Sequence, residues 1–257
     1  MKFVSAGGMR EGEQRAILED SGLNVSMMDQ AGKGLALVLA RRARQSVPPV
    51  SVVRMLAGPG NNGGDVFSAA FFLQEWGLRP EVWLVVPEPK IKGASRECYD
   101  RMIAAGVPCR ELSDELDWDL LEEEPSETMI LVDGLLGTGA KGEPAGILRR
   151  AVDYVRAQSQ EHVVVAVDIP TGMDADTGVT PGIGVQADLT VTMGFPKVGM
   201  SMAAALENLG SLVSVPIGLP GEFAEAIPDA RLDLQWISAE DVKRSFSRRR
   251  RDSHKGM

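Results

Sequence analysis

A run of apolar, mostly β-branched residues, followed by glycines and then by a helical pattern, stands out in the first third of the chain. The apolar run covers Val50 to Leu56, the glycine-rich stretch covers Ala57 to Asp65, and the helical pattern starts at Val66 and stops at Gly77. This order predicts a strand, a tight loop and a helix. Glycines let backbone N–H groups approach a ligand, so the unit favours anion binding, although a plain turn gives a similar pattern.

Further apolar runs alternate with helical patterns along the rest of the chain. The predicted strands cover 82–86, 107–110, 129–132, 163–167, 189–193 and 212–217, and the predicted helices between them include 94–105 and 147–157. Two more helices are predicted near the start, at 9–21 and from Ser26 to about Arg44, with Ser26 and Asp29 at the spacing of a capping box. The acidic stretch 114–127 predicts an exposed connection. Together the pattern predicts an α/β fold with a mainly parallel sheet and helices on both faces.

Charge and composition narrow the classes of function. The net charge of −9 argues against nucleic acid or an anionic membrane as the main partner. The two cysteines have no metal-ligand or redox spacing, which is typical of reduced thiols in a cytoplasmic protein. With only His162 and His254 as imidazoles, any catalysis must use carboxylates, lysines, backbone dipoles or an ion. No apolar run approaches the ~18 residues of a membrane helix, so we expect a soluble protein.

Three of the predicted strands end in polar, glycine-containing loops. These loops are Asn61–Asp65, Asp133–Gly139 and Asp168–Thr171. The carboxyl ends of parallel strands lie at one edge of a sheet, where ligands bind in open α/β folds. An aspartate at a single strand end often only caps the next turn, but three such loops at the same edge favour a binding site.

The residues in these loops resemble the motifs of a known family, the NAD(P)H-hydrate epimerases of the YjeF N-terminal domain type. The resemblance covers about residues 9–220. Its motifs are GNNGGD at 60–65, VDG at 132–134 with GTG at 137–139, VDIPTGMD at 167–174, and ADLTVT at 187–192 with PKVG at 196–199. Val66 and Phe71 depart from the family, which usually has a glycine and an arginine at these two positions.

This resemblance implies a three-layer α/β/α Rossmann-like sandwich, usually dimeric, that interconverts the R and S epimers of hydrated NADH and NADPH. It implies substrate contacts at three places in the chain. The implied residues are Asn61, Asn62, Gly63, Gly64 and Asp65, then Gly137, Thr138, Gly139, Ala140, Lys141, Gly142 and Glu143, and finally Asp168.

The resemblance also implies one potassium ion per subunit, held by Asn62, Asp133 and Thr171. Amide, carboxylate and hydroxyl oxygens suit such a hard cation. For catalysis we expect Asp168 to be the acid/base. The hydrate has its hydroxyl on the carbon beside the ring nitrogen, so a carboxylate that takes and returns one proton can open that centre and let it reclose on the other face.

Two other functions remain open from the sequence. Gly58, Gly60 and Gly63 match the G-x-G-x-x-G of NAD(P)-dependent oxidoreductases, but Glu88 is a poor candidate for the ribose-binding acid expected after the second strand. A non-catalytic nucleotide-binding or regulatory module of the same fold is the other alternative.

The sequence pattern near residue 236 predicts a domain boundary. We expect an epimerase domain over 1–236, followed by a short helix and a basic linker over 237–257. In bifunctional members of the family a segment similar to RDSHKG at 251–256 opens a second domain, an ADP- or ATP-dependent dehydratase. We therefore expect this chain to be the epimerase half of such a repair enzyme, the alternative being a stand-alone epimerase with a basic tail.

Overall fold

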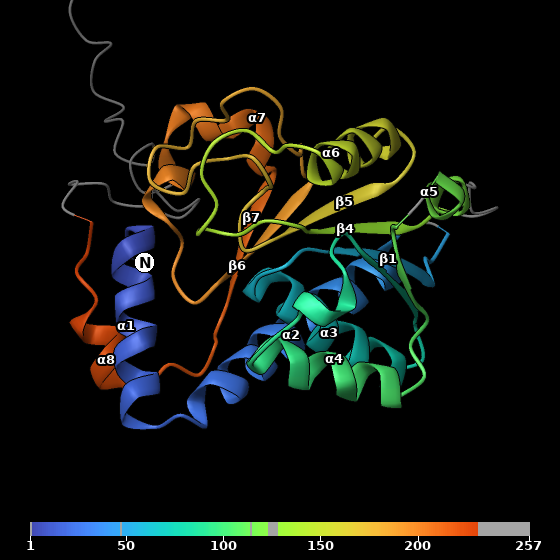
Figure 1. Cartoon of the computed structure of the whole chain (residues 1–257). Helices are drawn as coiled ribbons and strands as arrows, with labels where there is room; N and C mark the ends of the chain where they lie inside the picture. The colour runs from blue at the N-terminus through green and yellow to red at the C-terminus, as the bar shows by residue number, and fades with distance from the viewer. Residues whose placement is uncertain (1, 47, 114, 123–127, 231–257) are drawn as a thin grey trace, which may run out of the picture.

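The structure is a computed structural model that describes residues 2–46, 48–113, 115–122 and 128–230. Its centre is a seven-stranded, entirely parallel sheet in the order β3-β2-β1-β4-β5-β6-β7 (Figure 1). The strands are β1 Val52–Ala57, β2 Arg79–Leu84, β3 Cys109–Glu111, β4 Ile130–Gly134, β5 Val163–Val167, β6 Leu189–Met193 and β7 Ser211–Val215.

Helices cover both faces of this sheet, which confirms the predicted three-layer α/β/α architecture. In Figure 1 α2, α3 and α4 lie on one face, α5, α6 and α7 lie toward the other, and α1 packs beside α8 at one side. The helices are α1 Ala6–Glu19, α2 Leu23–Gln45, α3 Asn61–Glu75, α4 Ala94–Ala104, α5 Glu115–Glu122, α6 Ile147–Gln158, α7 Leu206–Leu209 and α8 Gly221–Ala226. Short 3-10 turns cover Glu88–Lys90, Val198–Ser201 and Ala203–Ala205.

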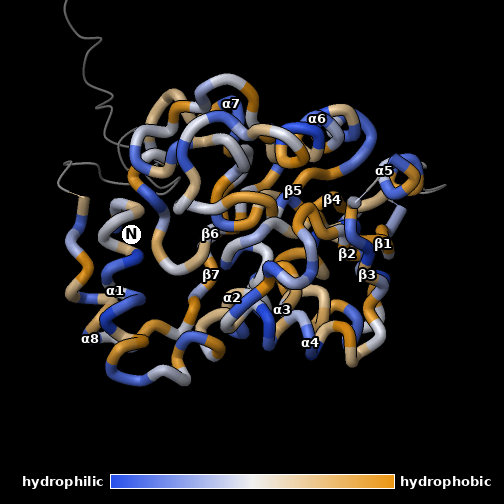
Figure 2. Tube along the Cα trace, in the orientation of Figure 1, coloured by the Kyte–Doolittle hydropathy of each residue, from blue (hydrophilic) through white to orange (hydrophobic). Residues whose placement is uncertain are grey.

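The central strands are apolar along almost their whole length because helices cover both sides of them. β4 is buried at every position, and β1 and β5 are buried at all but their first residue. A parallel sheet with two covered faces needs such continuous apolar runs, and the hydropathy colouring of Figure 2 follows them through the sheet. This explains why the strands could be predicted from the sequence.

Two helix starts and one connection differ from the sequence predictions. α2 begins at Leu23, so Ser26 lies inside the helix and the predicted capping box at Ser26 is wrong. The Asp20 carboxylate, which accepts from the Gly22 N–H, already makes the turn that leads into α2. α3 begins at Asn61, so its first turn contains the residues expected to form the loop. The predicted exposed connection is in part α5, which buries Trp118 and Leu121.

The strand order reverses between β1 and β4, and this reversal positions the site. From β1 the chain continues to β2 and β3 on one side, whereas β4 begins the half of the sheet on the other side. The segments after β1 and β4 therefore diverge and leave a crevice at the carboxyl ends of the strands. Among the helices of the described ranges, none is long and apolar enough to cross a membrane. The short helix and basic linker predicted over 237–257 lie outside these ranges.

Candidate active site

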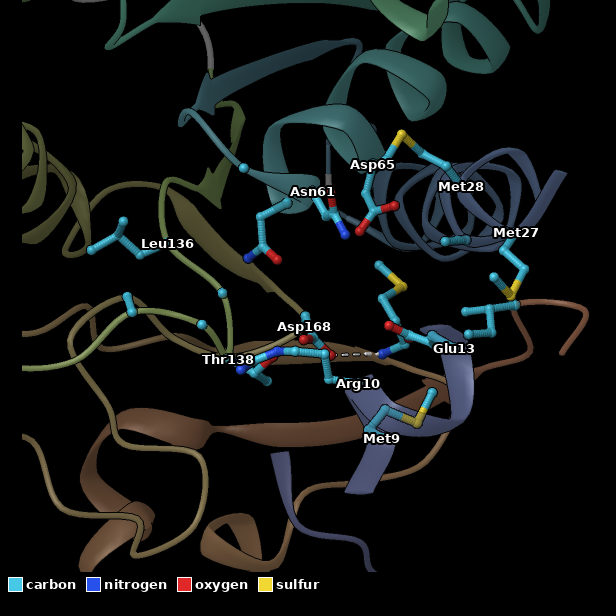
Figure 3. Close-up of a pocket in the computed structure, with 18 of the residues that line it drawn as sticks. Met9, Arg10, Glu13, Met27, Met28, Asn61, Asp65, Leu136, Thr138 and Asp168 are labelled. Carbon is cyan, nitrogen blue, oxygen red and sulfur yellow. Dashed lines mark hydrogen bonds between the residues drawn. The ribbon is translucent and has the colours of Figure 1, made fainter. Parts of the chain in front are cut away.

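A pocket of about 490 Å³ lies at this crevice (Figure 3). Its walls come from α1, α2, the first turn of α3, the turn after β4, the end of β5 and the segment after β6. In Figure 3 Asn61, Leu136 and Thr138 lie on one side, Met27 and Met28 lie on the other, and Asp168 lies between them. The pocket therefore combines one wall that carries the polar side chains of Asn61 and Thr138, a second wall that carries methionines, and a carboxylate.

Asp168 follows β5 directly and is held in an unusual backbone conformation. Its φ of 63° places it in the left-handed region, which aspartate and asparagine tolerate better than most residues. Oδ1 of Asp168 accepts hydrogen bonds from the Thr192 hydroxyl and the Met193 N–H, each at 3.1 Å, and from the Lys197 ammonium. Oδ2 accepts none from the described residues, so it is the oxygen available to a ligand.

Lys197 is the partner of Asp168 and is 2% exposed. Its ammonium also donates to Thr192 Oγ1 at 3.2 Å and to the Met193 carbonyl at 3.0 Å, so its three protons all have acceptors. Val4, which forms an isolated parallel bridge with Lys197, holds this segment in place, because its N–H donates to Pro196 O and its carbonyl accepts from Val198 N–H. Sequence reasoning noted the motif of Lys197 but assigned the lysine no role in the site.

Two more carboxyl groups, those of Glu13 and Asp65, line the pocket (Figure 3). Neither makes a hydrogen bond or ion pair within the described residues. Burial, then the negative charges of Asp168 and Glu13, raise the pKa of Asp65 well above its usual value, against the opposing charge of Lys197. Burial also raises the pKa of Glu13, with a smaller contribution from Asp168. Both carboxyl groups therefore hold a proton more readily than free ones do, and they lie beside the ion pair of Asp168 and Lys197.

Of the three residues expected to hold potassium, Asn62 lines the pocket, whereas Asp133 and Thr171 lie outside its lining. Asp133 is fully buried and accepts from the Thr171 hydroxyl at 2.7 Å, the Thr171 N–H at 2.8 Å and the Leu135 N–H at 3.2 Å. Burial raises the pKa of Asp133 to about 6, although these hydrogen bonds oppose the shift. Asn62 donates to the Val167 carbonyl at 2.8 Å, which leaves its amide oxygen without a donor in the described residues.

These groups fit a hard monovalent cation. The Asp133 carboxylate is surrounded only by neutral donors, so a cation would compensate a charge that the described side chains leave unbalanced. A Cβ at Gly137 would lie 2.3 Å from Asn62 Oδ1, so only glycine leaves the space beside that oxygen open. Within the described ranges, no group of three or more His, Cys, Asp or Glu side chains is placed so that it could hold a metal ion.

The glycines at the end of β1 and in the first turn of α3 have a packing role that the sequence did not reveal. A Cβ at Gly58 would lie 1.7 Å from Leu135 O, and a Cβ at Gly63 would lie 2.2 Å from Gly58 O. A Cβ at Gly64 would meet the sulfur of Met28 at 2.4 Å. These glycines therefore let β1, α3 and the turn after β4 approach one another, whereas Gly60 has open space around it.

The expected substrate-binding residues divide into those that line the pocket and those that do not. The pocket is lined by Asn61, Asn62, Asp65, Gly137, Thr138, Gly139, Ala140 and Asp168. Outside its lining lie Gly63, Gly64, Lys141, Gly142 and Glu143, and so do Asp133 and Thr171, two of the residues expected to hold the cation. Glu143 instead pairs with Arg149 at 3.0 Å.

Sequence reasoning missed the contribution of α1, which brings Met9, Arg10 and Glu13 to the pocket. It also missed Met27 and Met28 of α2 as lining residues. The spacing of Met9 and Glu13, four residues apart on one helical face, was the available signal for α1.

The amino-acid sequence is similar to one protein family and to several known proteins. The family model described as "YjeF-related protein N-terminus" matches residues 24–199. A bifunctional NAD(P)H-hydrate repair enzyme Nnr from Thermofilum pendens is 35% identical over 230 residues, which are 90% of this chain and 41% of that protein. An NAD(P)H-hydrate epimerase from Pirellula staleyi is 32% identical over 215 residues, 84% of this chain and 92% of that protein.

A solved structure shares the fold. The yeast protein ynu0, YNL200c, superposes with a TM-score of 0.74 at 23% identity, covering 94% of this chain and 98% of that one. The chain spans about two fifths of the length of the bifunctional relatives it matches.

Proposed function

The chain belongs to the YjeF-related protein N-terminus family, and on this premise we propose that it is an epimerase that interconverts the R and S forms of hydrated NADH and NADPH. The observation that carries the proposal is Asp168, a carboxylate in the pocket with one oxygen held by three donors and the other free. Such a group can exchange a proton with a bound hydroxyl.

The proposed reaction opens and recloses the ring of the hydrate. Oδ2 of Asp168 takes the hydroxyl proton, the C–O bond becomes a carbonyl, and the bond from this carbon to the ring nitrogen breaks with its electron pair on nitrogen. Asp168 then gives the proton to that nitrogen. Rotation of the freed aldehyde and reversal of the same steps close the ring on the other face, so no proton or electron is gained or lost overall.

Lys197 is a positioning residue in this scheme. Its buried ammonium stabilises the negative charge of Asp168, and the hydroxyl of Thr192 and the N–H of Met193 fix the same oxygen. These three donors prevent rotation of the carboxylate and leave Oδ2 for the substrate. No hydride acceptor is needed. Glu88, the poor candidate for the ribose-binding acid of an oxidoreductase, is paired with Arg96 at 3.0 Å.

We also propose that Asn62, Asp133 and Thr171 hold one potassium ion per subunit. When bound, the ion supplies a positive charge beside the substrate and balances Asp133. In the described chain Thr171 accepts from the Leu136 N–H at 3.1 Å, and Asp133 accepts from the Leu135 N–H. These contacts connect the cation ligands to the turn after β4, which lines the pocket.

The partners follow from the same premise. We propose that the chain acts as a homodimer. We also propose that it works with an ADP- or ATP-dependent dehydratase that removes water from the hydrate, because the matched relatives include bifunctional repair enzymes.

Light scattering of the purified chain tests the dimer. Incubation with ADP or ATP and the S-hydrate tests whether this chain itself regenerates the reduced cofactor, which we do not expect.

The direct test of the activity uses the purified R-hydrate of NADPH and chromatographic separation of the epimers. The wild-type chain should produce the S-hydrate well above the spontaneous rate, and Asp168→Asn should not, since an amide neither takes nor returns the proton. Asparagine also tolerates the positive φ at this position. Near wild-type turnover by Asp168→Asn would remove Asp168 from the mechanism.

A further inference from the structure

The charges that line the pocket are unevenly distributed. Three carboxyl groups, those of Glu13, Asp65 and Asp168, line it, and the cationic side chains in the described lining are Arg10 and Lys197. Lys197 is buried and paired with Asp168. Arg10 makes no ion pair or hydrogen bond within the described residues, including with Glu13 one turn later in α1. Arg10 is therefore the lining cation that remains available for an anionic ligand.

Arg10 lies against a turn whose backbone donors are also available. A Cβ at Gly139 would be 3.6 Å from Nη2 of Arg10, and Figure 3 shows Arg10 beside Thr138. The turn closes through the Ala140 N–H, which donates to the Gly137 carbonyl at 3.1 Å. The N–H groups of Gly137, Thr138 and Gly139 donate to no acceptor in the described residues. A guanidinium beside successive free N–H groups is an arrangement suited to a phosphate.

The position of Arg10 is fixed by the way α1 is anchored. The Ser5 hydroxyl accepts from the Gly8 N–H at 3.0 Å, and the Asp176 carboxylate accepts from the Ala6 N–H at 2.8 Å, so two donors of the first turn are satisfied. Gly12 packs against the side chain of Ile227 in the segment after α8. These contacts hold α1 over the pocket, and α1 lies outside the residues matched by the family model.

We propose that Arg10, together with the N–H groups of Gly137, Thr138 and Gly139, binds a phosphate group of the substrate and so determines which end of the dinucleotide enters the pocket. This inference rests on the proposed function. The unpaired Oδ2 of the Asp168 carboxylate repels a phosphate, whereas the reduced, hydrated nicotinamide ring has no charge. With a phosphate at Arg10, the ring is left to occupy the space beside Asp168, where the proton transfer takes place.

The first experiment measures binding without catalysis, by calorimetry with ADP-ribose, which carries the pyrophosphate but no nicotinamide. Arg10→Gln should weaken ADP-ribose binding by roughly 10- to 100-fold, because a charge-assisted contact is lost. The loss should shrink at high salt. The matched control is Arg15→Gln on the exposed side of the same helix, which should bind like the wild type. The same titrations with ADP-ribose 2′-phosphate add the 2′-phosphate. Arg10→Gln affinity within twofold of wild type for both probes, or no binding of either probe to the wild type, would overturn the inference.

The second experiment identifies the phosphate by steady-state kinetics with the two hydrates. An equal rise in KM for NADH-hydrate and NADPH-hydrate, at unchanged kcat, assigns Arg10 to the pyrophosphate. A rise confined to NADPH-hydrate assigns it to the 2′-phosphate, and unchanged KM for both refutes the role. If the wild type binds ADP-ribose through Arg10 but epimerises neither hydrate, the phosphate site stands and the proposed function fails.

Discussion

Replacing Lys197 with methionine tests the buried ion pair on which the mechanism depends. The side chains of Lys197 and Asp168 are 2% and 11% exposed, so solvent screens their interaction only weakly. Methionine fills a similar volume but leaves the Asp168 carboxylate in the interior with two neutral donors, those of Thr192 and Met193. Removal of one partner of a buried pair typically costs about 3–5 kcal/mol. For a chain of this size, that corresponds to a fall of roughly 6–20 °C in melting temperature.

The assay is urea unfolding followed by circular dichroism, with midpoint and slope fitted for each variant. The double variant Lys197→Met with Asp168→Asn removes both charges, so it should be more stable than the sum of the two single losses predicts. Lys90→Met, at an exposed lysine, is the control and should change stability by no more than about 0.5 kcal/mol. A Lys197→Met midpoint equal to that of Lys90→Met, or strictly additive losses in the double variant, would refute the reasoning.

Three further predictions concern the pocket and its surroundings. The folded state raises the pKa of Asp65, so the stability that Asp65 contributes is complete below the unfolded pKa of about 3.9 and is lost as pH rises through the folded pKa. Asp65→Asn should therefore melt at a higher temperature than wild type at pH 8 and lose this advantage toward pH 4. Thr171→Val should lose the rise in melting temperature that potassium gives the wild type over choline at equal ionic strength, and Thr171→Ser should keep it. Gly63→Ala should fail to fold because its Cβ would meet Gly58 O at 2.2 Å, whereas Gly60→Ala should remain soluble with a normal melt.

The strands were predictable because each is a short apolar run that helices cover on both faces. The predicted bounds of β5 and β6 match the structure residue for residue. Helix starts were harder to predict, since Asn61 and Asn62 read as loop residues although they form the first turn of α3. The acidic composition of α5 obscured Trp118 and Leu121, which lie three apart on one helical face and are buried.

The site was predictable where its residues follow strands. Asn61, Asp65, Thr138 and Asp168 come from three strand ends, and the structure brings all of them to one pocket. Arg10 and Glu13 could not be found in this way, because α1 precedes the first strand and reaches the pocket only through contacts distant in sequence.

The central claim is that the chain epimerises hydrated NAD(P)H with no net oxidation, reduction or loss of water. It is tested most directly by starting from each pure epimer separately. The purified R- and S-hydrates of NADPH are incubated with the chain in potassium buffer without ADP or ATP, and the epimers and NADPH are separated over time. The account predicts that both reactions reach the same epimer ratio, that total hydrate stays constant, and that no NADPH or NADP⁺ forms. Conversion of each pure epimer no faster than the spontaneous rate, or formation of reduced or oxidised cofactor, would contradict it.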